Sequence, residues 1–131
     1  MSDWRFATYA SELGLRVEAA SPGHARLRCP WRAGFANMIG VAHGGVVTAV
    51  MDTACGVALT ADADGTRGDG RVVTVSLTAN FLAPFREGDT LVAEAETAGG
   101  GRKLVTMRVR CARDDGTPVA VGQGVFRRLD R

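Results

Sequence analysis

The hydrophobic pattern is strongest between residues 44 and 60, where apolar and small residues are interrupted by a single charged side chain, that of Asp52. The run is too long for one strand, and its mixture of alanine, methionine and leucine favours a helix. A helix that is apolar on nearly every side has to be covered by other elements. We therefore expect one long helix that the rest of the chain encloses on most sides.

Alternating apolar and polar residues predict strands elsewhere in the chain. The longest alternation covers residues 73–81, in which valine, leucine, alanine and phenylalanine occupy every second position. Shorter patterns, bounded by glycine, proline and aspartate, predict further strands at residues 15–20, 24–29, 90–97, 103–113 and 119–126. A short helix is expected from Phe6 to Leu13, and residues 31–42 and 61–70 are expected to be irregular.

The expected order is a short helix, two strands, the long helix and then a four-stranded meander. One antiparallel sheet that curls around the long helix covers its apolar surface, which predicts a fold of the α+β class. The chain of 131 residues is long enough for a real core, and residues 1–131 are expected to form a single domain.

Composition and charge narrow the function classes. The net charge is only +2 and the arginines are spread along the sequence, so we expect no nucleic-acid partner. No segment is long and apolar enough to span a membrane, and the first residues lack the features of a signal peptide, which predicts a cytoplasmic protein. Cys29, Cys55 and Cys111 are odd in number and far apart, so they are expected to be reduced core thiols rather than disulfides or a zinc site.

The start of the long helix carries candidate chemistry. Residues 43–45 (His-Gly-Gly) precede it, and the first backbone N–H groups of a helix are unpaired and lie at its positive end. Glycines let a ligand oxygen approach such groups closely. About two turns further on, Asp52 places a carboxylate among apolar residues, which is costly unless the group is paired or hydrogen-bonded. Asp52 is therefore either a reactive group or a structural acid bonded to Thr48 or Thr53.

With Asn37 ahead of this turn and Asp52 after it, the chain resembles the hotdog-fold acyl-CoA thioesterases, in particular the branch typified by phenylacetyl-CoA thioesterases. The likeness covers nearly the whole chain and includes residues 80–84, 88–89, 101–103 and 120–124. In that family, a sheet wraps the long helix and two protomers join their sheets edge to edge. The resemblance implies a homodimer, or a dimer-of-dimers tetramer, in which the helix start of one protomer faces the carboxylate of the other.

The resemblance also implies an activity, the hydrolysis of an acyl-CoA thioester to a carboxylic acid and CoA. The Gly44 N–H would polarise the carbonyl, and Asp52 would act as general base or as nucleophile, two roles between which the sequence does not choose. Asn37 would orient the carbonyl or the water, and His43 would brace the turn through its imidazole. Thr74 would help to hold the water, although the alternating pattern equally fits a Thr74 that faces solvent.

Coenzyme A carries phosphate groups, so basic residues are expected at the rim of such a site. The candidates are Arg86, Arg102 and Lys103, for each of which an ordinary solvated surface position is the alternative. Gly45 is expected to contact the substrate beside Gly44. No metal or organic cofactor is expected, because CoA is part of the substrate.

Two other functions on the same fold stay open. Hydratases and dehydratases of acyl thioesters pair a histidine with an acid, and no second candidate acid lies near His43 in the sequence. The second alternative is a protein that binds acyl-CoA without turnover.

Overall fold

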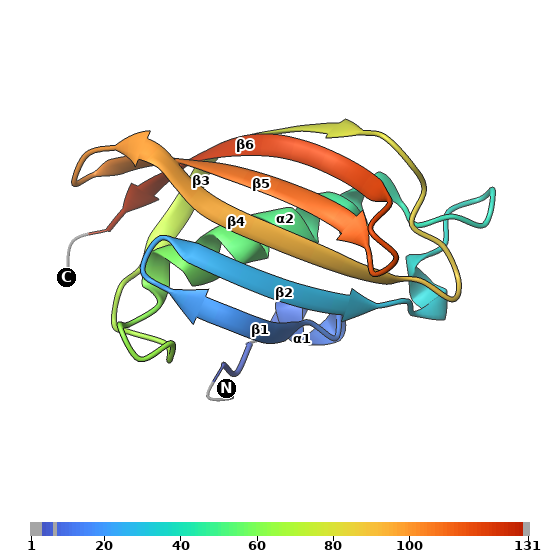
Figure 1. The fold of residues 1–131 in the computed structure, drawn as a ribbon, viewed down its shortest axis with the longest axis horizontal. Coiled ribbons are helices and arrows are strands. Elements are labelled where there is room, and N and C mark those ends of the chain that lie inside the picture. Colours follow the sequence, from blue (N-terminus) through green and yellow to red (C-terminus); the bar gives the residue numbers. More distant parts are fainter. Residues whose placement is uncertain (1–3, 7, 130–131) are drawn as a thin grey trace.

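A six-stranded antiparallel sheet wraps around one long helix in the computed structural model, which describes residues 4–6 and 8–129 (Figure 1). The elements are α1 (Thr8–Glu12), β1 (Arg16–Ser21), β2 (His24–Pro30), the 3₁₀ turn η1 (Ala33–Phe35), α2 (Gly44–Thr60), β3 (Val72–Phe81), β4 (Thr90–Gly100), β5 (Leu104–Arg113) and β6 (Pro118–Arg128). The strand order across the sheet is β1-β2-β4-β5-β6-β3. This arrangement confirms the predicted α+β class and the hotdog fold.

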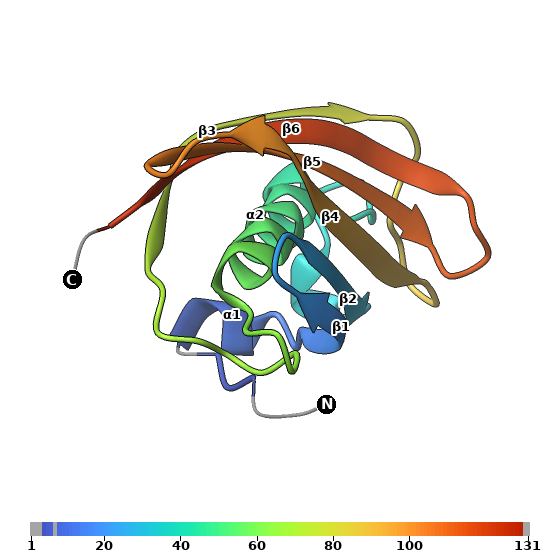
Figure 2. The same ribbon diagram turned by 60° about the vertical axis from the view of Figure 1, so that its left-hand side comes forward.

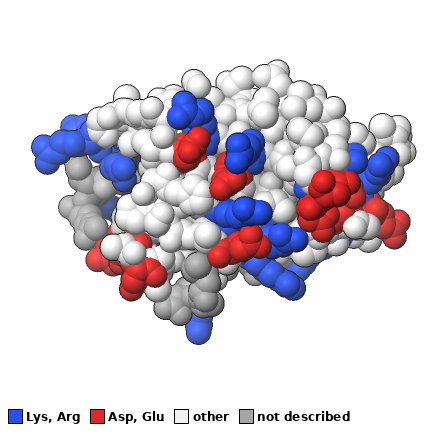
Figure 3. Space-filling model, viewed as in Figure 1, with Lys and Arg blue, Asp and Glu red and all other residues white. Residues whose placement is uncertain are grey.

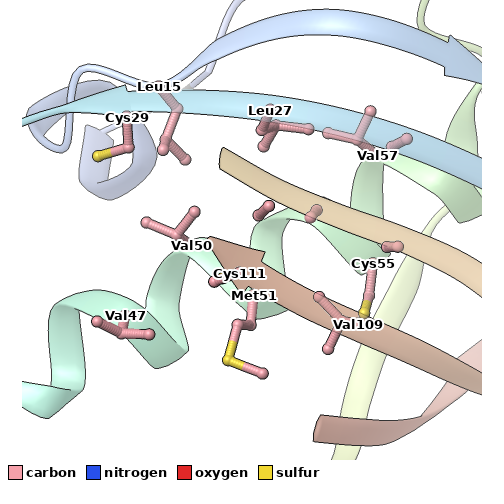
Figure 4. Close-up of a cluster of buried hydrophobic side chains, with 14 of the residues drawn as sticks. Leu15, Leu27, Cys29, Val47, Val50, Met51, Cys55, Val57, Val109 and Cys111 are labelled. Carbon is pink, nitrogen blue, oxygen red and sulfur yellow. The ribbon is translucent and has the colours of Figure 1, made fainter. Parts of the chain in front are cut away.

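The long helix α2 occupies the position expected from its apolar sequence. Val50, Met51 and Ala54 are fully buried between α2 and the concave face of the sheet. Figure 4 shows Val50 and Met51 of α2 in one cluster with side chains from the strands, among them Leu27 of β2 and Val109 of β5. Burial of this helix face therefore holds the sheet in its curved shape.

The cysteines are part of this core. Cys29, Cys55 and Cys111 are buried and free, as expected from their spacing. Burial raises the pKa of the Cys29 thiol to about 11 and that of the Cys111 thiol to about 12. Thiols with such pKa values stay protonated at neutral pH and act as small apolar groups.

The predicted meander is wrong for β3. Strands β4, β5 and β6 follow one another in space, but β3 pairs with β6 at the far edge of the sheet and not with β4. Between β3 and β4 the chain crosses from the edge beside β6 to the position between β2 and β5. Buried Phe85 anchors this crossing against Trp31, with ring centroids 5.4 Å apart. A local alternation pattern predicts a strand but does not identify its neighbour.

The strand ends differ from the predictions at the triple glycine. Gly99 and Gly100 belong to β4, which was expected to end at residue 97. Gly100 has a φ of 129°, and a Cβ there would lie 2.6 Å from the Leu104 carbonyl oxygen, so only glycine fits the point at which β4 meets β5.

The N-terminal segment and the loop of residues 61–71 lie on the side of α2 that faces away from the sheet (Figure 2). In this part of the molecule, Leu13 and Leu15 are buried against the core. Among residues 4–6 and 8–129, no helix has the length and apolar character that crossing a bilayer requires.

Candidate active site

Asp52 lies midway along α2 and is half-buried, with its side chain at the wall of a pocket rather than enclosed in the core. The Thr74 hydroxyl donates a hydrogen bond of 2.6 Å to Asp52 Oδ1. The alternative partners proposed from the sequence are engaged elsewhere. Thr53 donates to the Ala49 carbonyl oxygen at 2.8 Å, and Thr48 donates to the carbonyl oxygens of the first helix residues. The carboxylate is therefore held from β3, by a residue distant in sequence.

A β-bulge in β3 turns Thr74 toward α2. The register between β3 and β6 shifts between Thr74 and Ser76, so Val75 is an extra residue without a partner. Thr74 lies opposite buried Phe126 and shares its inward face, whereas the alternation alone placed Thr74 on the polar, solvent-facing side. Bulges commonly re-aim a side chain next to a functional site, and this one brings the hydroxyl to Asp52.

His43 shapes the start of α2 as its N-cap residue. Its Nδ1 accepts a hydrogen bond of 2.8 Å from the Gly45 N–H, and its carbonyl oxygen accepts one of 2.9 Å from the Val46 N–H. In the described part of the chain, the Gly44 N–H has no acceptor. The helix start thus presents one free amide donor at the positive end of the helix dipole.

Asn37 belongs to the loop that leads into this helix start. Its Oδ1 accepts hydrogen bonds from the backbone N–H groups of Ile39 at 3.0 Å and Val41 at 3.2 Å. Because these donors require an acceptor, they fix which side of the amide faces the loop. The NH₂ group of the Asn37 side chain can then donate a hydrogen bond to a ligand.

Within one chain, the helix start at Gly44 and the pair formed by Asp52 and Thr74 lie apart. Gly44 and Asp52 are eight positions apart on α2, which corresponds to about 12 Å along the helix and roughly 80° around it. Asp52 and Thr74 line one pocket of about 440 Å³, here called the Asp52 pocket. Gly44 lines a different one of about 320 Å³, beside Phe81 and Pro84.

The expected anion-binding residues lie in neither pocket. Arg86 is exposed next to Val41, and Arg102 and Lys103 are exposed in the turn between β4 and β5. That turn adjoins the end of β6, so Arg102 and Lys103 gather with Arg127 and Arg128 at one end of the molecule, on the left in Figure 3. Lys103 and Arg128 are thus neighbours in the fold although they are far apart in the sequence.

The Asp52 pocket has further walls that the sequence did not indicate. Arg67 and Arg71 line it from the loop after α2, and Trp4 and Phe6 line it from the N-terminal segment. These segments reach the pocket only through tertiary contacts, so no motif around them carries a signal.

Cys55 is fully buried and is not among the residues that line the Asp52 pocket, which disfavours it as a thiolate nucleophile. Cys55 follows Asp52 on α2, and burial, followed by the Asp52 charge, raises the pKa of its thiol to about 12. Within the described ranges, His, Cys, Asp and Glu side chains do not gather in a group of three that could hold a metal ion. The reactive groups that line the two pockets are therefore a carboxylate, hydroxyls and backbone amides.

The wrapped sheet, the glycine-rich helix start and the carboxylate on the helix define a hotdog-fold protein of the thioesterase class. The chain belongs to the thioesterase superfamily, whose family model matches residues 39–120. A Deinococcus radiodurans protein with a provisional esterase name is 31% identical over 125 residues, which cover 95% of this chain and 81% of that protein.

Two solved structures show the same architecture. The PaaI protein of the phenylacetic acid degradation operon of E. coli superposes with a TM-score of 0.85 at 25% identity, covering 95% of this chain and 86% of that one. A Streptococcus pneumoniae protein described as a hypothetical thioesterase, solved with coenzyme A, superposes with a TM-score of 0.76 at 22% identity, covering 89% of this chain and 87% of that one. Together these relationships support thioester hydrolysis in general.

Proposed function

We propose that the protein hydrolyses acyl-CoA thioesters to a carboxylic acid and CoA. The observation that carries the proposal is the Asp52 carboxylate, held by Thr74 at the wall of a pocket, in a chain whose helix start keeps a free amide donor at Gly44. Hydrolysis requires one group to activate or replace water and another to stabilise the developing oxyanion. The fold itself accommodates coenzyme A in the S. pneumoniae protein.

The complete site is proposed to form between two copies of the chain. Gly44 and Asp52 of one chain are too far apart to reach one carbonyl, whereas Gly44 of one copy and Asp52 of the other can face the same thioester. Strand β3 is the natural contact, because among the described strands it pairs only with β6 and exposes Val73 and Val75 at 45% and 57% of their surface. The minimum assembly is then a homodimer, and a dimer of dimers is compatible with it.

Each candidate residue has a specific role in this reaction. The Gly44 N–H donates to the carbonyl oxygen, and the Asn37 NH₂ donates to the carbonyl or to the water. Thr74 fixes Asp52 Oδ1, so Oδ2 is the oxygen that takes a proton from water or attacks the carbonyl carbon. His43 keeps the Gly45 N–H occupied and the turn in place.

Release of free thiol from a panel of acyl-CoAs tests the function directly. We expect turnover of at least one ester among phenylacetyl-CoA, hydroxybenzoyl-CoA and straight-chain acyl-CoAs. Esters whose acyl group is too large for the Asp52 pocket should not be hydrolysed. Water addition to crotonyl-CoA, without thiol release from any ester, would instead identify a hydratase. Tight binding of the esters without either reaction would identify a binding protein.

Thr74→Val tests the hydrogen bond to Asp52. Valine has nearly the same shape but no hydroxyl, and hydrogen bonds to charged groups are worth about 1.5–3 kcal/mol. We expect kcat to fall roughly 10- to 100-fold with little change in KM. Thr74→Ser keeps the hydroxyl and should retain most of the rate. Equal kcat values for the valine and serine variants would show that the bond has no role in turnover.

A further inference from the structure

The Asp52 pocket runs along α2 toward the C-terminal end of this helix. Its helix wall consists of Asp52, Thr53, Gly56, Val57 and Thr60, a stretch that spans about 12 Å of helix. Val72 and Thr74 of β3, Phe126 of β6, and Leu129 after β6 line it from the sheet side. Asp52 therefore lies at one end of this helix wall and Thr60 at the other.

The hydroxyl and indole N–H groups that line this pocket donate hydrogen bonds within the protein itself. Thr53 and Thr60 donate their hydroxyl protons to helix carbonyl oxygens at 2.8 Å each, and Thr74 donates to Asp52. The Trp4 indole N–H donates to the Gly65 carbonyl oxygen at 2.9 Å. Arg67 and Arg71 are exposed and belong to the rim.

A pantetheine arm carries amides that need hydrogen-bond partners, whereas an apolar acyl chain needs none. With the hydroxyl and indole donors of its wall engaged and the two arginines at its rim, the inner part of the pocket suits the acyl group and not the CoA arm. This assignment rests on the proposed function.

Trp4 lines the pocket and is tied to the loop that follows the C-terminal end of α2. Gly65, to which Trp4 is hydrogen-bonded, is buried in the loop directly after α2, so the indole ring sits beyond Thr60. Phe6 packs beside it, with ring centroids 6.4 Å apart, and both rings are half-buried against the core. The hydrogen bond joins residues that are 61 positions apart in the chain, which fixes the N-terminal segment across the pocket.

We propose that Trp4 determines substrate specificity by setting the longest acyl group that the enzyme accepts. An apolar acyl group that starts at Asp52 extends along α2 and meets the indole ring. Groups that end before Trp4 are bound, including aryl groups that stack on its face or on Phe6. Longer groups would have to displace Trp4 from Gly65, which breaks a hydrogen bond and exposes two aromatic rings.

The test compares kcat/KM for butanoyl-, octanoyl-, dodecanoyl- and palmitoyl-CoA in the wild type, Trp4→Ala and Tyr9→Ala. We expect Trp4→Ala to raise the ratio of long-chain to short-chain kcat/KM by roughly tenfold or more, mainly through a lower KM for the long esters. Tyr9 is the matched control, because it lies on the same segment, is 62% exposed and is not part of the pocket wall. Its alanine variant should keep the wild-type chain-length profile.

If Trp4→Ala does not fold, Trp4→Phe carries the same test with a smaller ring and no N–H donor, and should shift the profile in the same direction. The inference would be overturned if the chain-length profile of kcat/KM were unchanged in the Trp4 variant that folds. It would also be overturned if Tyr9→Ala shifted this profile equally. In both cases thiol release would still support the proposed function. Absence of thiol release from every ester in the wild type would overturn the function and the inference with it.

Discussion

Asp52→Asn should lower kcat for the best acyl-CoA ester by roughly two to four orders of magnitude, the usual contribution of a positioned general base. Asparagine has nearly the same shape as aspartate, and its amide oxygen can still accept the hydrogen bond from Thr74 that holds Asp52 Oδ1. What disappears is the oxygen that takes the proton from water or attacks the carbonyl. The loss is expected for both roles of Asp52, because an amide is neither a useful base nor a useful nucleophile.

The experiment measures steady-state thiol release together with thermal unfolding. Asp114→Asn is a suitable control, because Asp114 lies exposed in the turn between β5 and β6 and, among the described residues, its side chain makes only a 3.9 Å ion pair with Arg28. Both variants should unfold close to the wild-type temperature, and only Asp52→Asn should lose turnover. A rate near that of the wild type in Asp52→Asn would refute the proposed mechanism.

The features that depend on local sequence were predictable. The long apolar run predicted α2 with its observed bounds, and the His-Gly-Gly turn predicted where the helix starts. Both signals are local, because capping and helix periodicity act within a few residues. The same local reasoning located the six strands to within a few residues at each end. The free amide at Gly44 follows from this local geometry.

The features that depend on long-range pairing were not predictable. The position of β3 beside β6 depends on how the chain crosses the sheet, and the orientation of Thr74 depends on one unpaired residue, Val75. A single extra residue reverses which face the following positions occupy, and the alternation of Val73 with its neighbours contains no sign of it. Trp4 and Arg67 reach the Asp52 pocket from distant parts of the chain, so only the folded structure places them there.

Gly44→Pro should remove the oxyanion donor with little damage to the fold. Gly44 is the first residue of α2, a position at which proline is favoured, and its N–H has no acceptor to lose within the described chain. His43 already has φ −55° and ψ 137°, a conformation that is compatible with a following proline. Removal of one such donor costs roughly two to three orders of magnitude in kcat.

The control for this variant is Gly44→Ala. Alanine keeps the N–H, and its Cβ would lie 3.4 Å from the Phe81 ring, which is within ordinary contact distance. Most of the rate should therefore survive in Gly44→Ala and be lost in Gly44→Pro. Equal rates for the two variants would show that the Gly44 amide does not stabilise the transition state.

Mixing Gly44→Pro with Asp52→Asn then tests whether one site uses both chains. If Gly44 of one protomer acts with Asp52 of its partner, each mixed dimer contains one site with both substitutions and one site with neither. Unfolding and refolding the two inactive variants together in equal amounts should restore about one quarter of the wild-type sites. Each variant refolded alone should stay inactive. If the two residues act within one chain, every site in the mixture carries a substitution and no activity returns.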